Sequence, residues 1–138
     1  MTIRQFITTH RIRMTCERAD RNPNMVNMTK DDQDWNRWAS HYQCRFTHGR
    51  RRFTTYFSMG PAHTQEPKAS EVLDCLALDA ATIENSKSFE DWCAELGYDT
   101  DSRSAERMYQ VCVRQAEQLE RFLGAELYRE LFWETEHE

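Results

Sequence analysis

Hydrophobic and polar residues alternate along residues 41–59, which read HYQCRFTHGRRRFTTYFSM. An alternation of period two is typical of a β-strand with one buried face. The pair His48-Gly49 divides the stretch and predicts a tight turn, so the sequence predicts a hairpin in which Cys44 lies opposite Phe53. One face would be apolar and would hold Tyr42, Cys44, Phe46, Phe53, Thr55, Phe57 and Met59. The other would be polar and basic and would hold His41, Gln43, Arg45, Thr47, Arg50, Arg52, Thr54, Tyr56 and Ser58.

Residues 3–17 predict a third strand, because apolar and polar residues alternate at positions 11–17. If this strand joins the hairpin, Arg11 and Arg13 fall on its basic face. The segment that follows, up to residue 37, begins with an RNPN turn and continues as a polar connection with room for a short helical turn.

After Pro67 the apolar residues recur every three or four positions, which is the spacing of amphipathic helices. Serines before the second and third apolar runs are typical N-caps, and glycines after them are typical helix ends. The predicted helices are residues 67–85, a short helix between Ser88 and Gly97, residues 103–123, and a last helix after Gly124.

Strands followed by helices predict an α+β fold. We expect a three-stranded antiparallel sheet in the N-terminal half, covered on one face by three to four C-terminal helices. A chain of 138 residues fits a single domain, residues 1–138. Within it, residues 1–60 would form a β-rich basic half, and residues 67–138 would form a helical acidic half.

The net charge of -5 conceals an asymmetry between the two halves. Residues 1–68 hold 12 basic and 6 acidic residues, a net +6, whereas residues 69–138 hold 6 basic and 17 acidic residues, a net -11. This distribution bears on the partners of the protein more than on its fold.

The five cysteines are widely spaced and stand among apolar residues, which indicates buried free thiols in a reducing compartment. No apolar run approaches the ~20 residues of a membrane span. We therefore expect a soluble, cytoplasmic protein that contacts no membrane. The spacing of His41, Cys44 and His48 invites a metal site, but His41 and Cys44 would point to opposite faces of one strand. We expect neither a metal nor another cofactor.

No catalytic motif is present: GxSxG, HExxH, P-loop and GxGxxG patterns are all absent. We therefore expect a protein that is not an enzyme and has no catalytic residue. Arginines beside an exposed aromatic residue suit a phosphate backbone and a stacked base, although they equally suit a solvated sheet face. The first candidate binding surface is Arg11, Arg13, Arg45, Arg50, Arg51, Arg52 and Tyr56. The second candidate is the acidic row of the last helix, Glu126, Glu130 and Glu134.

Several segments together resemble a family of short proteins encoded by phages and prophages. They include FITTHRIRM, ERADRNPNM, TYFSMGPAH, EVLDCLALDAA, SFEDWCAELGYDTDSRSAER and QLERFLG, and they cover nearly the whole chain. No reaction is attached to this resemblance, so it implies no catalytic residue. Small acidic proteins of mobile elements are enriched in inhibitors of host defence, of which anti-CRISPR proteins are one kind.

The resemblance implies a non-catalytic inhibitor that binds stoichiometrically to a host defence protein or a Cas nucleoprotein complex. The alternative is a nucleic-acid-binding module that uses the basic sheet face. The sequence leaves the target and the oligomeric state open.

Overall fold

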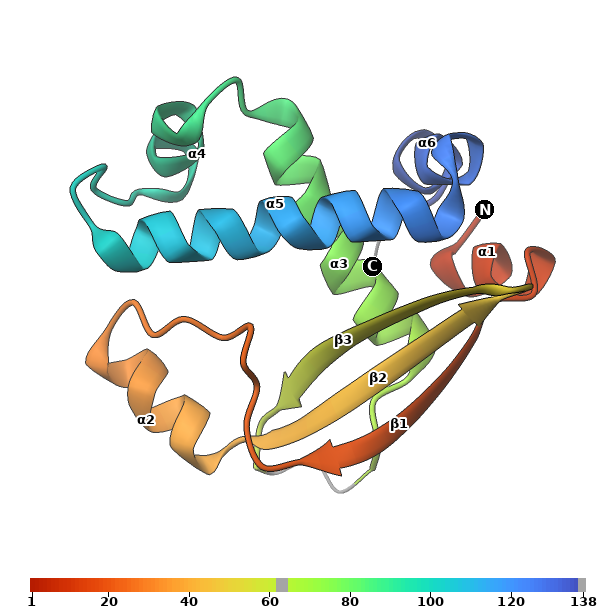
Figure 1. The fold of residues 1–138 in the computed structure, drawn as a ribbon, viewed down its shortest axis with the longest axis horizontal. Helices are drawn as coiled ribbons and strands as arrows, with labels where there is room; N and C mark the ends of the chain where they lie inside the picture. Colours follow the sequence, from red (N-terminus) through yellow and green to blue (C-terminus); the bar gives the residue numbers. More distant parts are fainter. Residues whose placement is uncertain (62–64, 137–138) are drawn as a thin grey trace.

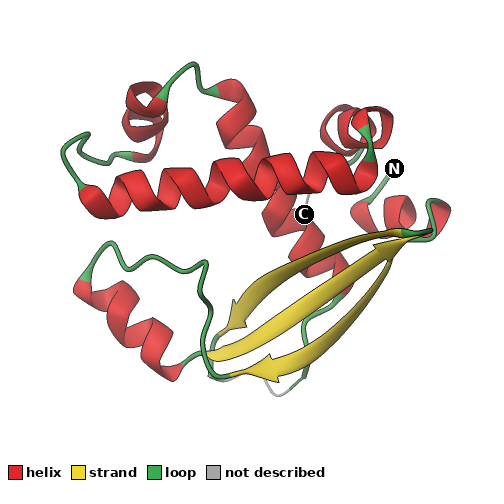
Figure 2. Ribbon diagram, in the orientation of Figure 1, coloured by secondary structure: helices red, strands yellow, loops and turns green. Residues whose placement is uncertain are grey.

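A computed structural model describes residues 1–61 and 65–136. Figure 1 shows a sheet at the front with most of the helices on one side of it, and Figure 2 separates the two kinds of element by colour. The elements are α1 Ile3–Thr9, β1 Arg13–Ala19, α2 Lys30–Trp38, β2 Ser40–His48, β3 Arg51–Met59, α3 Ala69–Asn85, α4 Phe89–Leu96, α5 Arg103–Leu123 and α6 Ala125–Trp133. The predicted α+β class is confirmed. No helix in the described ranges is long and apolar enough to cross a membrane.

The three strands form one antiparallel sheet in the order β1-β2-β3, so β2 is central. In the hairpin Phe46 lies opposite Phe53, and His48 lies opposite Arg51. The turn is therefore Gly49-Arg50, one residue later than the sequence predicts, and the predicted pairing of Cys44 with Phe53 is wrong. Gly49 takes a φ of 61°, which type II′ turns place at the first central position.

The two faces of the hairpin are nevertheless the predicted ones, because moving the turn by one residue shifts the cross-strand partners by two. The inner face buries Tyr42, Cys44, Phe46, Phe53, Thr55 and Met59, while Phe57 is half-buried. Phe122 from α5 joins this layer, with its ring centroid 6.3 Å from Phe46 and 5.9 Å from Phe53. This aromatic group fixes α5 over the sheet (Figure 1).

Residues 3–9 are helical and do not extend the first strand. Thr2 caps α1 by accepting a hydrogen bond from the backbone N–H of Gln5, whose side chain accepts one from the N–H of Thr2. Ile3 and Phe6, three residues apart, are both buried. The strand begins only at Arg13, so Arg11 lies in the connecting turn with a φ of 55° and is not on the sheet face.

A second, smaller core lies between α4 and the start of α5. Trp92, Cys93 and Ala105 are buried there, with half-buried aromatic rings around them. The predicted caps are confirmed: the Ser88 side chain accepts from the N–H of Asp91, and α4 ends at Gly97 with a φ of 78°. The caps thus set the angle at which α4 returns to α5.

Candidate partner-binding surface

The outer face of the sheet is arranged in rows that cross all three strands. The row nearest the hairpin turn is Arg13, Thr47 and Arg52, in which Thr47 pairs with both arginines. The next row is Thr15, Arg45 and Thr54, followed by Glu17, Gln43 and Tyr56. The positive charge of this face is therefore concentrated at its turn end.

Arg45 and Tyr56 belong to a polar network and not to a free basic patch. The Nη2 group of Arg45 donates to Glu17 Oε1 and to Gln43 Oε1, each at 2.9 Å. Gln43 Nε2 in turn donates to the Tyr56 hydroxyl at 3.1 Å. Glu17 offsets the charge of Arg45, and the half-buried Tyr56 offers less of its ring for stacking than a fully exposed tyrosine would.

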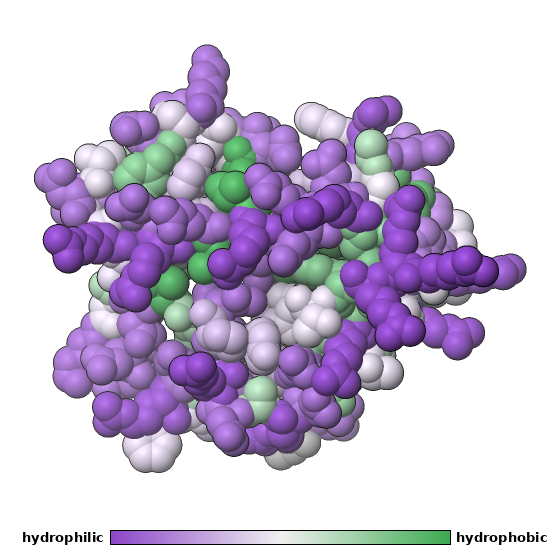
Figure 3. All heavy atoms as spheres, viewed as in Figure 1, coloured by the Kyte–Doolittle hydropathy of each residue, from purple (hydrophilic) through white to green (hydrophobic). Residues whose placement is uncertain are grey.

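The other five predicted arginines gather around the hairpin turn, and we call this group the arginine end. It consists of Arg11 and Arg13 around the start of β1, Arg50 in the turn, and Arg51 and Arg52 at the start of β3. All five are exposed, and none forms an ion pair with a carboxylate in the described part of the chain. Figure 3 shows hydrophilic side chains projecting from this end of the molecule.

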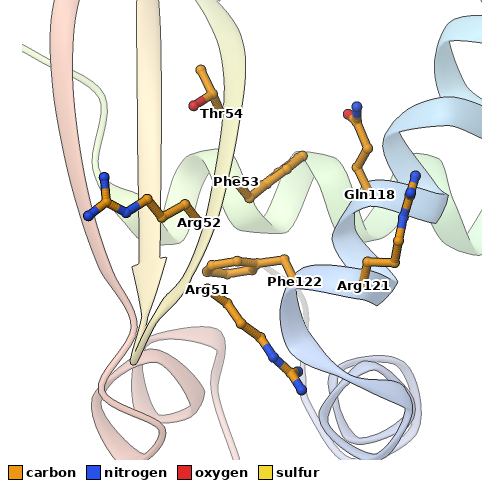
Figure 4. A pocket seen from close by; sticks show the side chains of 7 residues that line it. All are labelled: Arg51, Arg52, Phe53, Thr54, Gln118, Arg121 and Phe122. Carbon is orange, nitrogen blue, oxygen red and sulfur yellow. The ribbon is translucent and has the colours of Figure 1, made fainter.

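A groove runs between β3 and α5 beside the arginine end, with a volume of about 500 Å³. Phe53 and Phe122 form its base, and Arg51 and Arg121 stand at its rim (Figure 4). Arg52 points to the opposite side of the sheet, so the neighbouring residues Arg51 and Arg52 lie on different faces of the molecule.

Arg51 also has a structural role at the α5–α6 junction. A Cβ added to Gly124 would lie only 2.9 Å from an Nη atom of Arg51, so this guanidinium lies directly on the glycine. Gly124 has a φ of 85° and is the C-cap of α5, where a cation offsets the negative end of the helix dipole. Arg51 therefore contributes to the stability of the fold, whereas Arg50 and Arg52 make no such contact.

The acidic row of α6 is not a uniform surface. Glu130 is half-buried, and its Oε1 lies 2.9 Å from Nε2 of His10, which ties α6 to the end of α1. Glu126 and Glu134 are exposed, but Glu134 is the C-cap residue beyond the last helical turn. Only Glu126 and Glu134 of this second candidate are free to meet a partner.

The structure offers no metal site at the residues that suggested one. His41 Nδ1 lies 2.7 Å from Ser58 Oγ, and His41 Nε2 lies 2.9 Å from the carbonyl oxygen of Asn36, so both ring nitrogens are occupied. Cys44 lies on the opposite face of the same strand. In residues 1–61 and 65–136, no group of three or more His, Cys, Asp or Glu side chains is arranged to hold a metal ion.

The five cysteines are free thiols; three are buried, Cys16 is half-buried and Cys75 is exposed. Cys75 is exposed because the buried stripe of α3 runs through Val72, Leu73 and Leu76 and leaves residue 75 on the outer side. Burial and the nearby Asp79 carboxylate raise the pKa of Cys112 to about 12, and burial raises the pKa of Cys44 further.

Thiol labelling with an aromatic disulfide reagent should therefore show one fast cysteine, Cys75, and four slow ones. The pKa of Cys75 is itself raised by partial burial and nearby carboxylates, so its exposure, and not its pKa, sets it apart from the other thiols. The Cys75→Ser variant should lose the fast phase and keep the slow ones. A fast phase that survives in this variant would show that another thiol is accessible.

Two exposed tryptophans on α2 are a feature that sequence reasoning missed. Trp35 and Trp38 are 42% and 70% exposed, and α2 has no buried residue at all. Their spacing of three residues places them on one side of the helix. A sequence signal for the start of this helix was present in the TKDDQDW segment, where Thr29 and Asp32 form a capping box.

Comparisons with family models, with curated proteins and with solved structures gave no match for this chain.

Proposed function

We propose that the protein is a non-catalytic, phage- or prophage-encoded inhibitor of a host defence system, similar in action to anti-CRISPR proteins. It would bind stoichiometrically to a nucleoprotein effector and deny that effector its target. The phage or prophage origin in this proposal rests on the resemblance of the sequence segments to proteins of that kind. The observation that supports a binding surface is the arginine end.

Five exposed guanidinium groups close together repel one another unless anions lie between them. Within the described residues the only arginine of the predicted surface with a carboxylate partner is Arg45. The charge of Arg13, Arg50 and Arg52 is therefore available to an external partner. Arginine forks bind phosphate and carboxylate oxygens in pairs, so a polyanion or an acidic protein patch suits this end.

The arginine end is a better candidate than the acidic helix because of what surrounds each. Glu130 is held by His10, so Glu126 and Glu134 are the two exposed carboxylates of the acidic row. The arginines come from two separate parts of the chain, which the sheet brings together at one end of β2.

The proposal is tested by adding the purified protein to a purified Cas nucleoprotein complex and measuring target cleavage. Inhibition should rise with added protein and saturate near one protein per effector, and the two should co-elute in size-exclusion chromatography. Undiminished cleavage across a panel of effector types from phage hosts, with no co-elution, would contradict it.

The second candidate function is a nucleic-acid-binding module, which the same five arginines favour. The two functions differ in whether the purified protein binds nucleic acid in the absence of an effector. Gel shifts with duplex DNA across a salt series would show direct binding. The slope of log affinity against log salt is about -0.9 per phosphate neutralised, so contact by all five arginines predicts a slope of about -4 to -5. Absence of a gel shift together with inhibition of an effector would favour the inhibitor.

A further inference from the structure

A polar cleft lies at the opposite end of the sheet from the arginine end, where α2 joins β2. Its volume is about 450 Å³, within the range of roughly 300–1,000 Å³ that small-molecule sites occupy. The end of β1, the following loop and α2 form its walls. The polar side chains among the lining residues include Arg21, Asn27, Gln33, Asn36 and Arg37.

The charge of the cleft is positive, since three arginines and one aspartate line it. Arg21 and Arg37 have no hydrogen-bond or ion-pair partner in the described part of the chain, and Arg18 makes only a contact with the Tyr42 ring at 5.4 Å. The arginines come from β1, the loop and α2, so the fold brings together residues that the sequence keeps apart. Because Arg18 is engaged with Tyr42, Arg21 and Arg37 are the arginines of the cleft whose planar guanidinium groups are available to a phosphate.

Carboxamide groups supply the second half of a recognition site. Asn36 Nδ2 donates to Asn27 Oδ1 at 3.4 Å, which leaves the other polar atom of each amide unused. The Gln33 side chain also has no partner among the described residues. Unused amide donors and acceptors beside an anion site suit the hydrogen-bonding edge of a nucleobase.

The position of α2 has no explanation in hydrophobic packing, because none of its side chains is buried. The helix is instead anchored at its C-terminal end, where the carbonyl of Asn36 bonds to the buried His41 ring, which also contacts Ser58. The loop before it is tied down by a hydrogen bond of 3.0 Å from Asn22 Nδ2 to Ser58 Oγ. The loop at Asn22 and the C-terminal end of α2 are therefore fixed to the sheet before any ligand arrives, which lowers the entropy lost on binding.

We propose that this cleft binds the phosphate ester of a nucleotide, with Arg21 and Arg37 on the phosphate and the carboxamides on the base. The phosphate belongs either to a free nucleotide or to a nucleotide within a nucleic-acid strand. The site is separate from the arginine end, because β2 separates the two along its whole length (Figure 1).

The test is isothermal titration calorimetry of the full chain with four probes: inorganic phosphate, the four ribonucleoside 5′-monophosphates, the corresponding nucleosides, and short single-stranded oligonucleotides. At least one monophosphate or oligonucleotide should bind saturably with one site per chain, while the nucleosides should not bind. Arg21→Ala combined with Arg37→Ala should weaken this binding by about a hundredfold, since each charged hydrogen bond contributes about tenfold or more.

The matched control is Arg50→Ala combined with Arg52→Ala, which removes the same charge from the other end of the sheet and should leave monophosphate affinity unchanged. Binding of monophosphates that depends on Arg21 and Arg37 identifies a free nucleotide as the source. Dependence seen with oligonucleotides alone identifies a nucleic-acid strand. If no probe binds saturably to the wild-type chain, or if both double variants behave alike, the proposal is wrong. Gln33→Ala, which changes no charge, provides a second variant in which base selectivity should fall.

Discussion

Replacing Arg13, Arg50 and Arg52 by glutamate should reduce the affinity for the nucleoprotein effector, or for duplex DNA if that is the partner, by about three orders of magnitude or more. Each lost charge-assisted hydrogen bond costs about 1.5–3 kcal/mol, and ~1.4 kcal/mol corresponds to a tenfold change in affinity. The three side chains are exposed and have no intramolecular partner among the described residues, so the fold should not need them. Affinity is measured by titration and inhibition by the cleavage assay, with melting temperatures alongside.

The control for this variant reverses three other exposed arginines, Arg4, Arg103 and Arg107. Arg103 and Arg107 lie at the start of α5, at the other end of the molecule from the hairpin turn (Figure 1), and Arg4 lies near Phe57, six residues along β3 from Arg51. The control has the same net charge as the test variant, so a general effect of charge should appear equally in both. Arg51 is left in place in both variants because it lies on Gly124 at the α5–α6 junction. Equal affinities for the two variants would show that the arginine end is not the binding surface.

The hairpin illustrates what a sequence pattern determines and what it leaves open. Its two faces are predictable, because the period-two alternation survives any shift of partners by an even number. The register is not, because the pattern alone cannot decide whether Gly49 is the first or the second residue of the turn. That choice depends on backbone conformation: Gly49 has a φ of 61°, and Arg50 follows it within the turn.

The sequence was enough to select the exposed arginines of the candidate surface, but it was not enough to predict how they are arranged. The sequence identifies Arg45 as a basic residue of the outer face, yet only the pairing of β1 with β2 brings Glu17 within 2.9 Å of it. Arg11 follows the alternation of a strand, but the cap at Thr2 and the buried Ile3 and Phe6 favour a helix before it. The three arginines of the α2 cleft share no sequence pattern, so nothing but the fold could group them.

The RNPN turn at residues 21–24 has a structural explanation. The backbone N–H of Asn24 donates to Asn22 Oδ1 at 3.0 Å, which is the hydrogen bond of an Asx turn. Arg114 of α5 donates to Asn24 Oδ1 at 3.3 Å, and Asn22 bonds to Ser58 of β3. The turn thus links α5 to the sheet and positions one wall of the α2 cleft.

Replacing Phe46 by alanine should lower the free energy of unfolding by about 3–5 kcal/mol, the largest stability effect that we expect from a single change in this chain. Phe46 is 1% exposed and lies at the centre of the sheet, with Phe53 and Phe122 around its ring. Neighbours from a strand and a helix cannot close the cavity without moving the sheet against α5. Chemical denaturation followed by circular dichroism measures the change.

Phe57→Ala provides the comparison, since Phe57 is on the same face of the sheet but half-buried. Its loss should cost clearly less than that of Phe46, because part of its ring already meets water and its removal leaves an open hollow instead of a closed cavity. The ratio between the two variants therefore tests how deeply the two ends of the sheet are buried. If Phe57→Ala proved as destabilising as Phe46→Ala, the end of β3 would lie deeper in the core than the half-burial of Phe57 indicates.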